Sequence, residues 1–130
     1  MKKVLVLLLL MVSTSVFAEW TRVTDSKDGD MTVYIDYETI KRKVNKVKIW
    51  ILFDFKTVKK AISYRYLSQM ERDEYDCDEE TSRMLDLYWY SGNMKQGDIV
   101  YRETNMKDGT LSLPPGSTGE RLLKIACGKK

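Results

Sequence analysis

The chain has 130 residues, of which 22 are Lys or Arg, 19 are Asp or Glu and none is His. Without histidine the chain lacks the commonest general base and metal ligand, which excludes a serine triad built on histidine. We therefore expect a protein that is not an enzyme and that has no cofactor or metal site. The nearly balanced charge predicts no general attraction to nucleic acid or to a membrane surface.

Residues 1–18 have the pattern of a secretory signal peptide. Lys2 and Lys3 precede an apolar run, and Val16 and Ala18 occupy the small-residue positions before a cleavage site. The apolar run is shorter than the ~20 residues that span a membrane, so we expect no transmembrane segment after cleavage. An uncleaved membrane anchor is the alternative interpretation.

Residues 19–130 then form the mature protein, which we interpret as one domain. Loss of Lys2 and Lys3 leaves 20 basic and 19 acidic residues, so this domain is close to neutral. We expect it to be exported to the periplasm or to the cell surface of a bacterium. No cysteine lies near the cleavage point, so a lipid anchor is not expected.

Most of the mature chain alternates between strand patterns and turns. The strongest strand is residues 46–56, where apolar residues recur at every second position from Val47 to Phe55. A helical turn is indicated at residues 37–41. In chain order, the predicted strands are residues 19–24, 31–37, 46–56, 62–70, 75–91 and 97–104.

One helix is predicted near the end of the chain, after Pro114 and Pro115. Ser117 and Glu120 have the spacing of a capping box, in which each side chain bonds the backbone amide of the other residue. Gly128 fits the C-terminal stop. The helix is too short to be stable alone, so it must pack against the strands.

Cys77 and Cys127 are the only two cysteines. Export places them in an oxidising compartment, which favours a disulfide over two free thiols. This bond would join the end of the helix to the sheet. It closes a loop of ~50 residues and should stabilise the fold by roughly 4 kcal/mol in the chain-entropy model.

The predicted fold is therefore α+β: a single six-stranded antiparallel sheet, connected as a meander, with one C-terminal helix packed on one face and linked by the disulfide. Strand alternation places Leu85, Leu87 and Trp89 on the face that the helix covers, and Met84 on the other.

A single helix leaves the second face of the sheet uncovered. Aromatic residues predicted there suggest a homodimer interface or a partner-binding surface, and loops that seal the face are the alternative. The candidate residues are Trp50, Tyr64, Tyr66, Tyr88 and Tyr90.

A basic run is the candidate ligand-binding site, and it consists of Lys41, Arg42, Lys43, Lys46 and Lys48. Such a run could bind an acidic protein patch, an anionic polysaccharide or an acidic lipid headgroup. A lysine-rich segment that only remains solvated is the alternative. The acidic run of Glu71, Asp73, Glu74, Asp76, Asp78, Glu79 and Glu80 is interpreted as a solvated strand edge rather than as a carboxylate active site.

Five segments together resemble the bacterial surface-adhesin protein E family. They are VYIDYETIKR (33–42), VKIWILFDF (47–55), EYDC (74–77), YSGNMKQGDIV (90–100) and PPGSTGERLLKIAC (114–127). The resemblance implies a six-stranded sheet with a flanking helix, a disulfide between the two cysteines and often a dimer. It also implies adhesion to host extracellular-matrix and plasma proteins, such as laminin or vitronectin.

The leading functional hypothesis is thus an exported, non-enzymatic binding module that adheres to a host protein or an anionic polysaccharide. The alternative is a periplasmic structural or accessory protein that dimerises, or docks an envelope partner, through the aromatic face.

Overall fold

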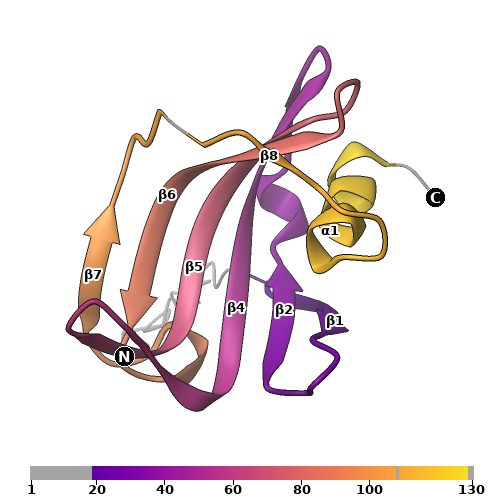
Figure 1. The fold of residues 1–130 in the computed structure, drawn as a ribbon. Coiled ribbons are helices and arrows are strands. Elements are labelled where there is room, and N and C mark those ends of the chain that lie inside the picture. Colours follow the sequence, from indigo (N-terminus) through magenta and orange to yellow (C-terminus); the bar gives the residue numbers. More distant parts are fainter. Residues whose placement is uncertain (1–18, 108, 129–130) are drawn as a thin grey trace, which may run out of the picture.

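The computed structural model describes residues 19–107 and 109–128. Its main element is an antiparallel sheet with the strand order β1-β2-β4-β5-β6-β7, in which neighbours in space are nearly neighbours in the chain (Figure 1). These strands are β1 (Thr21–Asp25), β2 (Met31–Ile35), β4 (Lys46–Ala61), β5 (Tyr64–Asp76), β6 (Thr81–Tyr90) and β7 (Ile99–Glu103).

Two short strands extend this sheet. Strand β3 (Lys41–Lys43) pairs with the beginning of β4, and β8 (Leu111–Ser112) pairs with the beginning of β6. The meander is therefore confirmed, but the described sheet has eight strands rather than six. Two 3-10 turns, η1 (Tyr37–Thr39) and η2 (Asn93–Lys95), complete the connections, and η1 lies where a helical turn was expected.

The boundary between β5 and β6 differs from the prediction. The chain reverses at residues 77–80, so that β5 includes most of the acidic run. The cause is local, because Asp76 Oδ1 accepts hydrogen bonds from the backbone N–H groups of Asp78 and Glu79 at 3.1 and 3.0 Å. An aspartate that bonds amides two and three residues ahead closes a turn.

Helix α1 (Thr118–Cys127) begins as its sequence predicts. The Glu120 N–H donates to Ser117 Oγ at 3.1 Å. The Glu120 carboxylate pairs with Lys124 at 3.1 Å, and the Ser117 N–H donates to the Pro114 carbonyl, so the second half of the capping box is replaced. The helix ends at Gly128, whose φ of 69° is the left-handed value that glycine adopts freely.

The core lies between α1 and one side of the sheet, which we call the helix face. Leu122, Leu123 and Ala126 of α1 are buried in one cluster with Val33, Ile35, Val47, Ile49, Ile51 and Tyr75. The predicted disulfide is present, with the Cα atoms of Cys77 and Cys127 5.8 Å apart. The opposite side of the sheet, which carries Lys48 and Trp50, is called the open face.

Figure 1 shows that α1 lies over the β1–β2 side of the sheet, and that no helix of the described residues covers the β6–β7 side. The β4–β5 hairpin curls away from the plane of the sheet at its tip. The curl begins where the pairing register shifts between Asp54 and Lys59 of β4. Such an irregularity bends a strand and increases its twist.

We expect the Cys77→Ala/Cys127→Ala variant to lose about 4 kcal/mol of unfolding free energy, because the crosslink restricts a long loop in the unfolded chain. Urea denaturation of the mature domain measures this change. Ser117→Ala is the comparison, since loss of one helix cap should remove only ~1 kcal/mol. A double-cysteine variant no less stable than Ser117→Ala would contradict the role assigned to the disulfide.

Candidate functional site

The β3–β4 hairpin gathers most of the predicted basic site. Antiparallel pairing places Lys41 opposite Lys48 and Lys43 opposite Lys46, so these four side chains share one face of the hairpin. Val47 is buried on the helix face, and residues alternate along a strand, so the lysines lie on the open face. All four lysines are exposed.

Arg42 is separated from these lysines. It pairs with Val47 and lies on the opposite side of the hairpin. Its guanidinium donates to the Cys127 carbonyl at 3.5 Å and to the Val44 carbonyl at 3.2 Å. Arg42 therefore connects the hairpin to the end of α1, and the structure brings together four of the five basic residues.

The charges of the hairpin are only partly neutralised. Lys46 Nζ lies 3.9 Å from Glu74, which also accepts from Arg83 at 3.1 Å. Within residues 19–107 and 109–128, Lys41, Lys43 and Lys48 form no ion pair. Like charges directly opposite each other destabilise a strand pair, so this arrangement favours an external anion as the missing partner.

Two aromatic residues continue the open face from the lysines. Trp50 follows Lys46 and Lys48 on the same side of β4, and its ring centroid lies 6.1 Å from that of Tyr88. The Arg72 guanidinium lies 5.7 Å from the Trp50 ring and also bonds Asp86 at 2.6 Å. We call Lys41, Lys43, Lys46, Lys48, Trp50 and Tyr88 the basic–aromatic surface.

The other three predicted aromatic residues do not join this surface. Tyr90 pairs with Ser68 and is buried. Tyr66 stacks on Trp89 at 4.4 Å, and Tyr64 lies 5.4 Å from Tyr101.

Trp89 pairs with Gln69 and lies on the helix face. Tyr64 and Tyr66 both contact Trp89, so they lie on the helix face as well, opposite Trp50. The curl of the β4–β5 hairpin explains this placement. A strand-parity argument fails where the register shifts.

A bulge also displaces Met84 from its predicted side. The β5–β6 register shifts between Arg72 and Asp73, which pairs Met84 with Asp73 on the helix face. Leu87 pairs with Glu71 and stays on the helix face, as predicted. When one strand has an extra residue, the side chains beyond that residue point to the opposite face of the sheet from the one that simple alternation predicts.

The acidic run is not one solvated edge. Asp78, Glu79 and Glu80 are exposed on the turn, but Glu71 and Asp73 are buried on the helix face. Their cross-strand neighbours include Ile49 and Ile51 of β4, with Met84 and Leu87 of β6.

This apolar setting disfavours ionised carboxylates. Burial raises the pKa of Asp73 to about 6. Burial and the charge of Asp73 raise the pKa of Glu71 well above its ordinary value. Asp73 Oδ1 has no hydrogen-bond partner in the described part of the chain.

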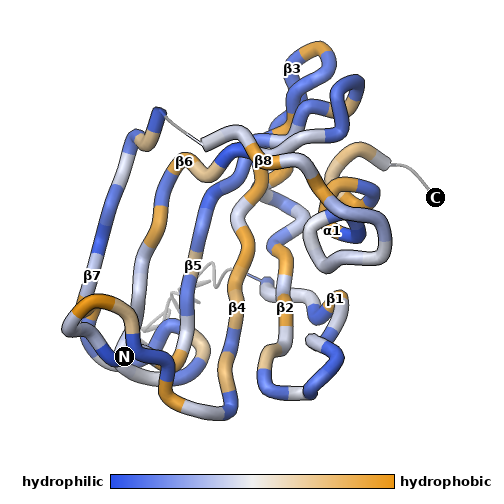
Figure 2. The backbone as a smooth tube through the Cα atoms, in the orientation of Figure 1, coloured by the Kyte–Doolittle hydropathy of each residue, from blue (hydrophilic) through white to orange (hydrophobic). Residues whose placement is uncertain are grey.

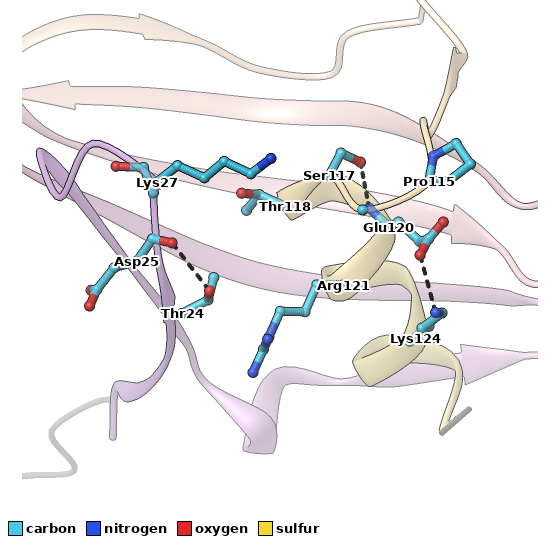
Figure 3. A pocket seen from close by; sticks show the side chains of 11 residues that line it. Thr24, Asp25, Lys27, Pro115, Ser117, Thr118, Glu120, Arg121 and Lys124 are labelled. Carbon is cyan, nitrogen blue, oxygen red and sulfur yellow. Dashed lines mark hydrogen bonds and ion pairs between the residues drawn. The ribbon is translucent and has the colours of Figure 1, made fainter.

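A cleft of 760 Å³ lies between the β1–β2 turn and the beginning of α1. Figure 3 shows Thr24 and Lys27 on one side of it, with Thr118 and Arg121 on the other. Several of its polar groups already have partners, since Ser117 caps the helix and Glu120 pairs with Lys124. The sequence did not predict this cleft, and no chemistry is assigned to it.

A wider charge asymmetry was visible in the sequence but was missed. Between residues 39 and 70 there is one acid, Asp54, against nine basic residues. Four of these follow the predicted site and lie in or beside the β4–β5 hairpin: Lys56, Lys59, Lys60 and Arg65. Both ends of β4 are therefore basic, although residues 19–130 together are nearly neutral.

The fold and its surfaces define a class of small antiparallel-sheet protein with a disulfide-tethered C-terminal helix and a basic open face. Within the described residues, no helix is long and apolar enough to cross a membrane. A family model for surface-adhesin protein E matches residues 20–128. The chain belongs to the surface-adhesin protein E family.

Solved structures of protein E from Haemophilus influenzae have a similar fold. Crystal form II has a TM-score of 0.60 and 19% sequence identity, covering 82% of this chain and 87% of that one. Protein E from non-typeable H. influenzae has a TM-score of 0.55 and 20% identity, covering 88% and 79%. No curated protein matches the chain. At this level of identity the structures establish a shared fold.

The buried acids predict an unusual pH dependence. Because the native pKa of Asp73 lies above its unfolded value, the native state retains a proton that the unfolded state loses. The stability that protonated Asp73 contributes is fully present below pH ~4 and is lost as pH rises through about 6. We expect Asp73→Asn to become more stable relative to wild type across this window.

Urea midpoints at a series of pH values measure the difference between wild type and Asp73→Asn. Asp78→Asn, on the exposed turn, is the matched control and should not show this gain. A wild type that gains stability relative to Asp73→Asn as pH rises from 4 to 6 would contradict the assignment.

Proposed function

We propose that the mature domain is an exported, non-enzymatic binding module that adheres to host extracellular-matrix or plasma proteins. Membership of the surface-adhesin family supports this role. The absence of histidine agrees with a function that depends on binding rather than on proton transfer.

The observation that carries the proposal is the set of unneutralised lysines on the β3–β4 hairpin. Lys41, Lys43 and Lys48 share one exposed face and form no ion pair within the described residues, although Lys48 lies opposite Glu74 of β5 on its other side. An acidic protein segment or a sulfated polysaccharide chain would supply the missing negative charge.

Trp50 and Tyr88 give the same surface an apolar part. Both are half-buried on the open face, next to the lysines. Aromatic residues at the centre of an interface provide much of its contact area, and charges at the rim guide association. The ligand would therefore meet the lysines first and then pack against the two rings.

Docking of an envelope partner, or of a second copy, on Trp50 and Tyr88 is the second candidate function. It is favoured by the same half-buried aromatic pair, which no described helix covers. Light scattering of the mature domain and quenching of Trp50 fluorescence distinguish this candidate from adhesion to a host ligand. A dimer in which Trp50 is protected from the quencher would support this candidate.

We expect the Lys41→Gln/Lys43→Gln/Lys48→Gln variant to bind immobilised heparin or laminin about tenfold more weakly at low salt, since three exposed charges at about 0.5 kcal/mol each are lost. Biolayer interferometry measures the affinities. The difference should shrink as salt screens the charges.

The matched control is Lys56→Gln/Lys60→Gln/Arg65→Gln, which removes three charges at the other end of β4. It should retain most of the binding. Equal losses in the two variants would mean that only net charge matters, and an unchanged affinity in the first would eliminate the β3–β4 hairpin as the site.

A further inference from the structure

We propose that the tip of the β4–β5 hairpin, residues 56–65, is a membrane-docking site that inserts Ile62 and Val58 among the headgroups of an anionic phospholipid bilayer. This site lies at the opposite end of β4 from the basic–aromatic surface. It does not depend on the adhesive role proposed above.

The tip exposes large apolar side chains. Ile62 is 84% exposed and Val58 is 50% exposed. Figure 2 shows the apolar tip, with hydrophilic residues on its flanks. Exposed apolar side chains at the end of a hairpin are suited to entering the interfacial region of a bilayer.

The backbone at Ile62 strengthens this argument. Ala61 pairs with Tyr64, so the two-residue turn consists of Ile62 and Ser63, and Ile62 has a φ of 58°. Gly or Asn normally occupies such a position, because a β-branched side chain is strained in the left-handed region. Strain at an exposed apolar residue motivates a functional hypothesis for its side chain, and the charges around the tip decide which contact is proposed.

The exposed charges at the tip match an anionic surface, whereas Lys59 is paired with Asp30 of the β1–β2 turn. No acidic residue occurs from Phe55 to Met70. Lys56, Lys60 and Arg65 are exposed, and Lys60 pairs directly with Arg65. Basic residues beside exposed apolar groups are the combination that binds anionic lipid headgroups.

Ring contacts on its inner side hold the hairpin over β6 and β7. Tyr66 stacks on Trp89 at 4.4 Å, Tyr64 contacts Tyr101 at 5.4 Å, and Phe55 lies 5.8 Å from Tyr66. Lys60 and Arg65 alternate with Tyr64 along the strands and point away from these rings. The tip is thus preorganised, which reduces the entropy lost on docking.

The β3–β4 hairpin has a similar tip but a different neighbourhood. Val44 is 85% exposed, has a φ of 57° and stands between lysines. However, Lys46 pairs with Asp76, and the exposed acids Asp78 and Glu79 follow on the next turn. These carboxylates place negative charge beside the β3–β4 tip, so we expect Val44 to contribute less than Ile62 to binding an anionic bilayer, and Val44 is the comparison residue.

The experiment is flotation of the full mature domain with phosphatidylcholine vesicles that contain or lack phosphatidylglycerol. Wild type should float with the anionic vesicles and remain behind with the neutral ones. Ile62→Asn should lower the partition coefficient at least about tenfold, because the inserted apolar side chain is lost. Its melting temperature should equal or exceed that of wild type, because Asn tolerates the left-handed conformation.

Val44→Asn makes the same substitution, at the same left-handed backbone conformation, in the β3–β4 tip. This variant should float as well as wild type. Lys60→Gln/Arg65→Gln should weaken binding to anionic vesicles, because two exposed charges at the tip are removed. The proposal is overturned if wild type does not float with anionic vesicles, if it floats equally with neutral ones, or if Ile62→Asn and Val44→Asn bind alike.

Discussion

Strand β4 is the constraint on which the rest of the structure depends. Its 16 residues pair with β2, β3 and β5. Because side chains alternate, one side of β4 supplies Val47, Ile49 and Ile51 to the core, and the other supplies Lys48 and Trp50 to the open face. The same residue pattern therefore determines both the packing of α1 and the candidate ligand-binding surface.

The two ends of β4 carry the two proposed contacts. Each end is a tight hairpin with an exposed β-branched residue in the left-handed conformation and basic residues on its flanks. The bend between Asp54 and Lys59 shortens the span of β4, but the two tips still lie at its opposite ends. One end can thus contact a bilayer while the other binds a soluble or matrix-bound ligand.

Local and countable features of the fold were predictable from the sequence. Ser117 and Gly128 mark the ends of α1 by their spacing, and two cysteines in an exported chain allow a single disulfide. The alternating apolar residues of β4 identified the central strand. The two short strands were missed because runs of two or three residues carry almost no periodic signal.

The errors arose where tertiary context overrides composition. Acidic residues normally indicate solvent, yet Glu71 and Asp73 lie on a central strand between apolar neighbours. Tyr64 and Tyr66 were assigned to the wrong side because parity cannot anticipate the register shift that curls the β4–β5 hairpin. The basic residues of the β4–β5 hairpin stand out in a count of charges along the chain. They are more widely spaced than those at residues 41–48, so their local signal is weaker.

The central claim is that an anionic ligand binds to the basic–aromatic surface. The most direct measurement is an NMR titration of the mature domain with a short sulfated oligosaccharide, following every backbone amide. The account predicts that the largest shift changes lie at residues 41–50 and around Tyr88. Changes concentrated at the cleft of Thr24, Lys27 and Arg121, or spread evenly over all basic residues, would contradict it.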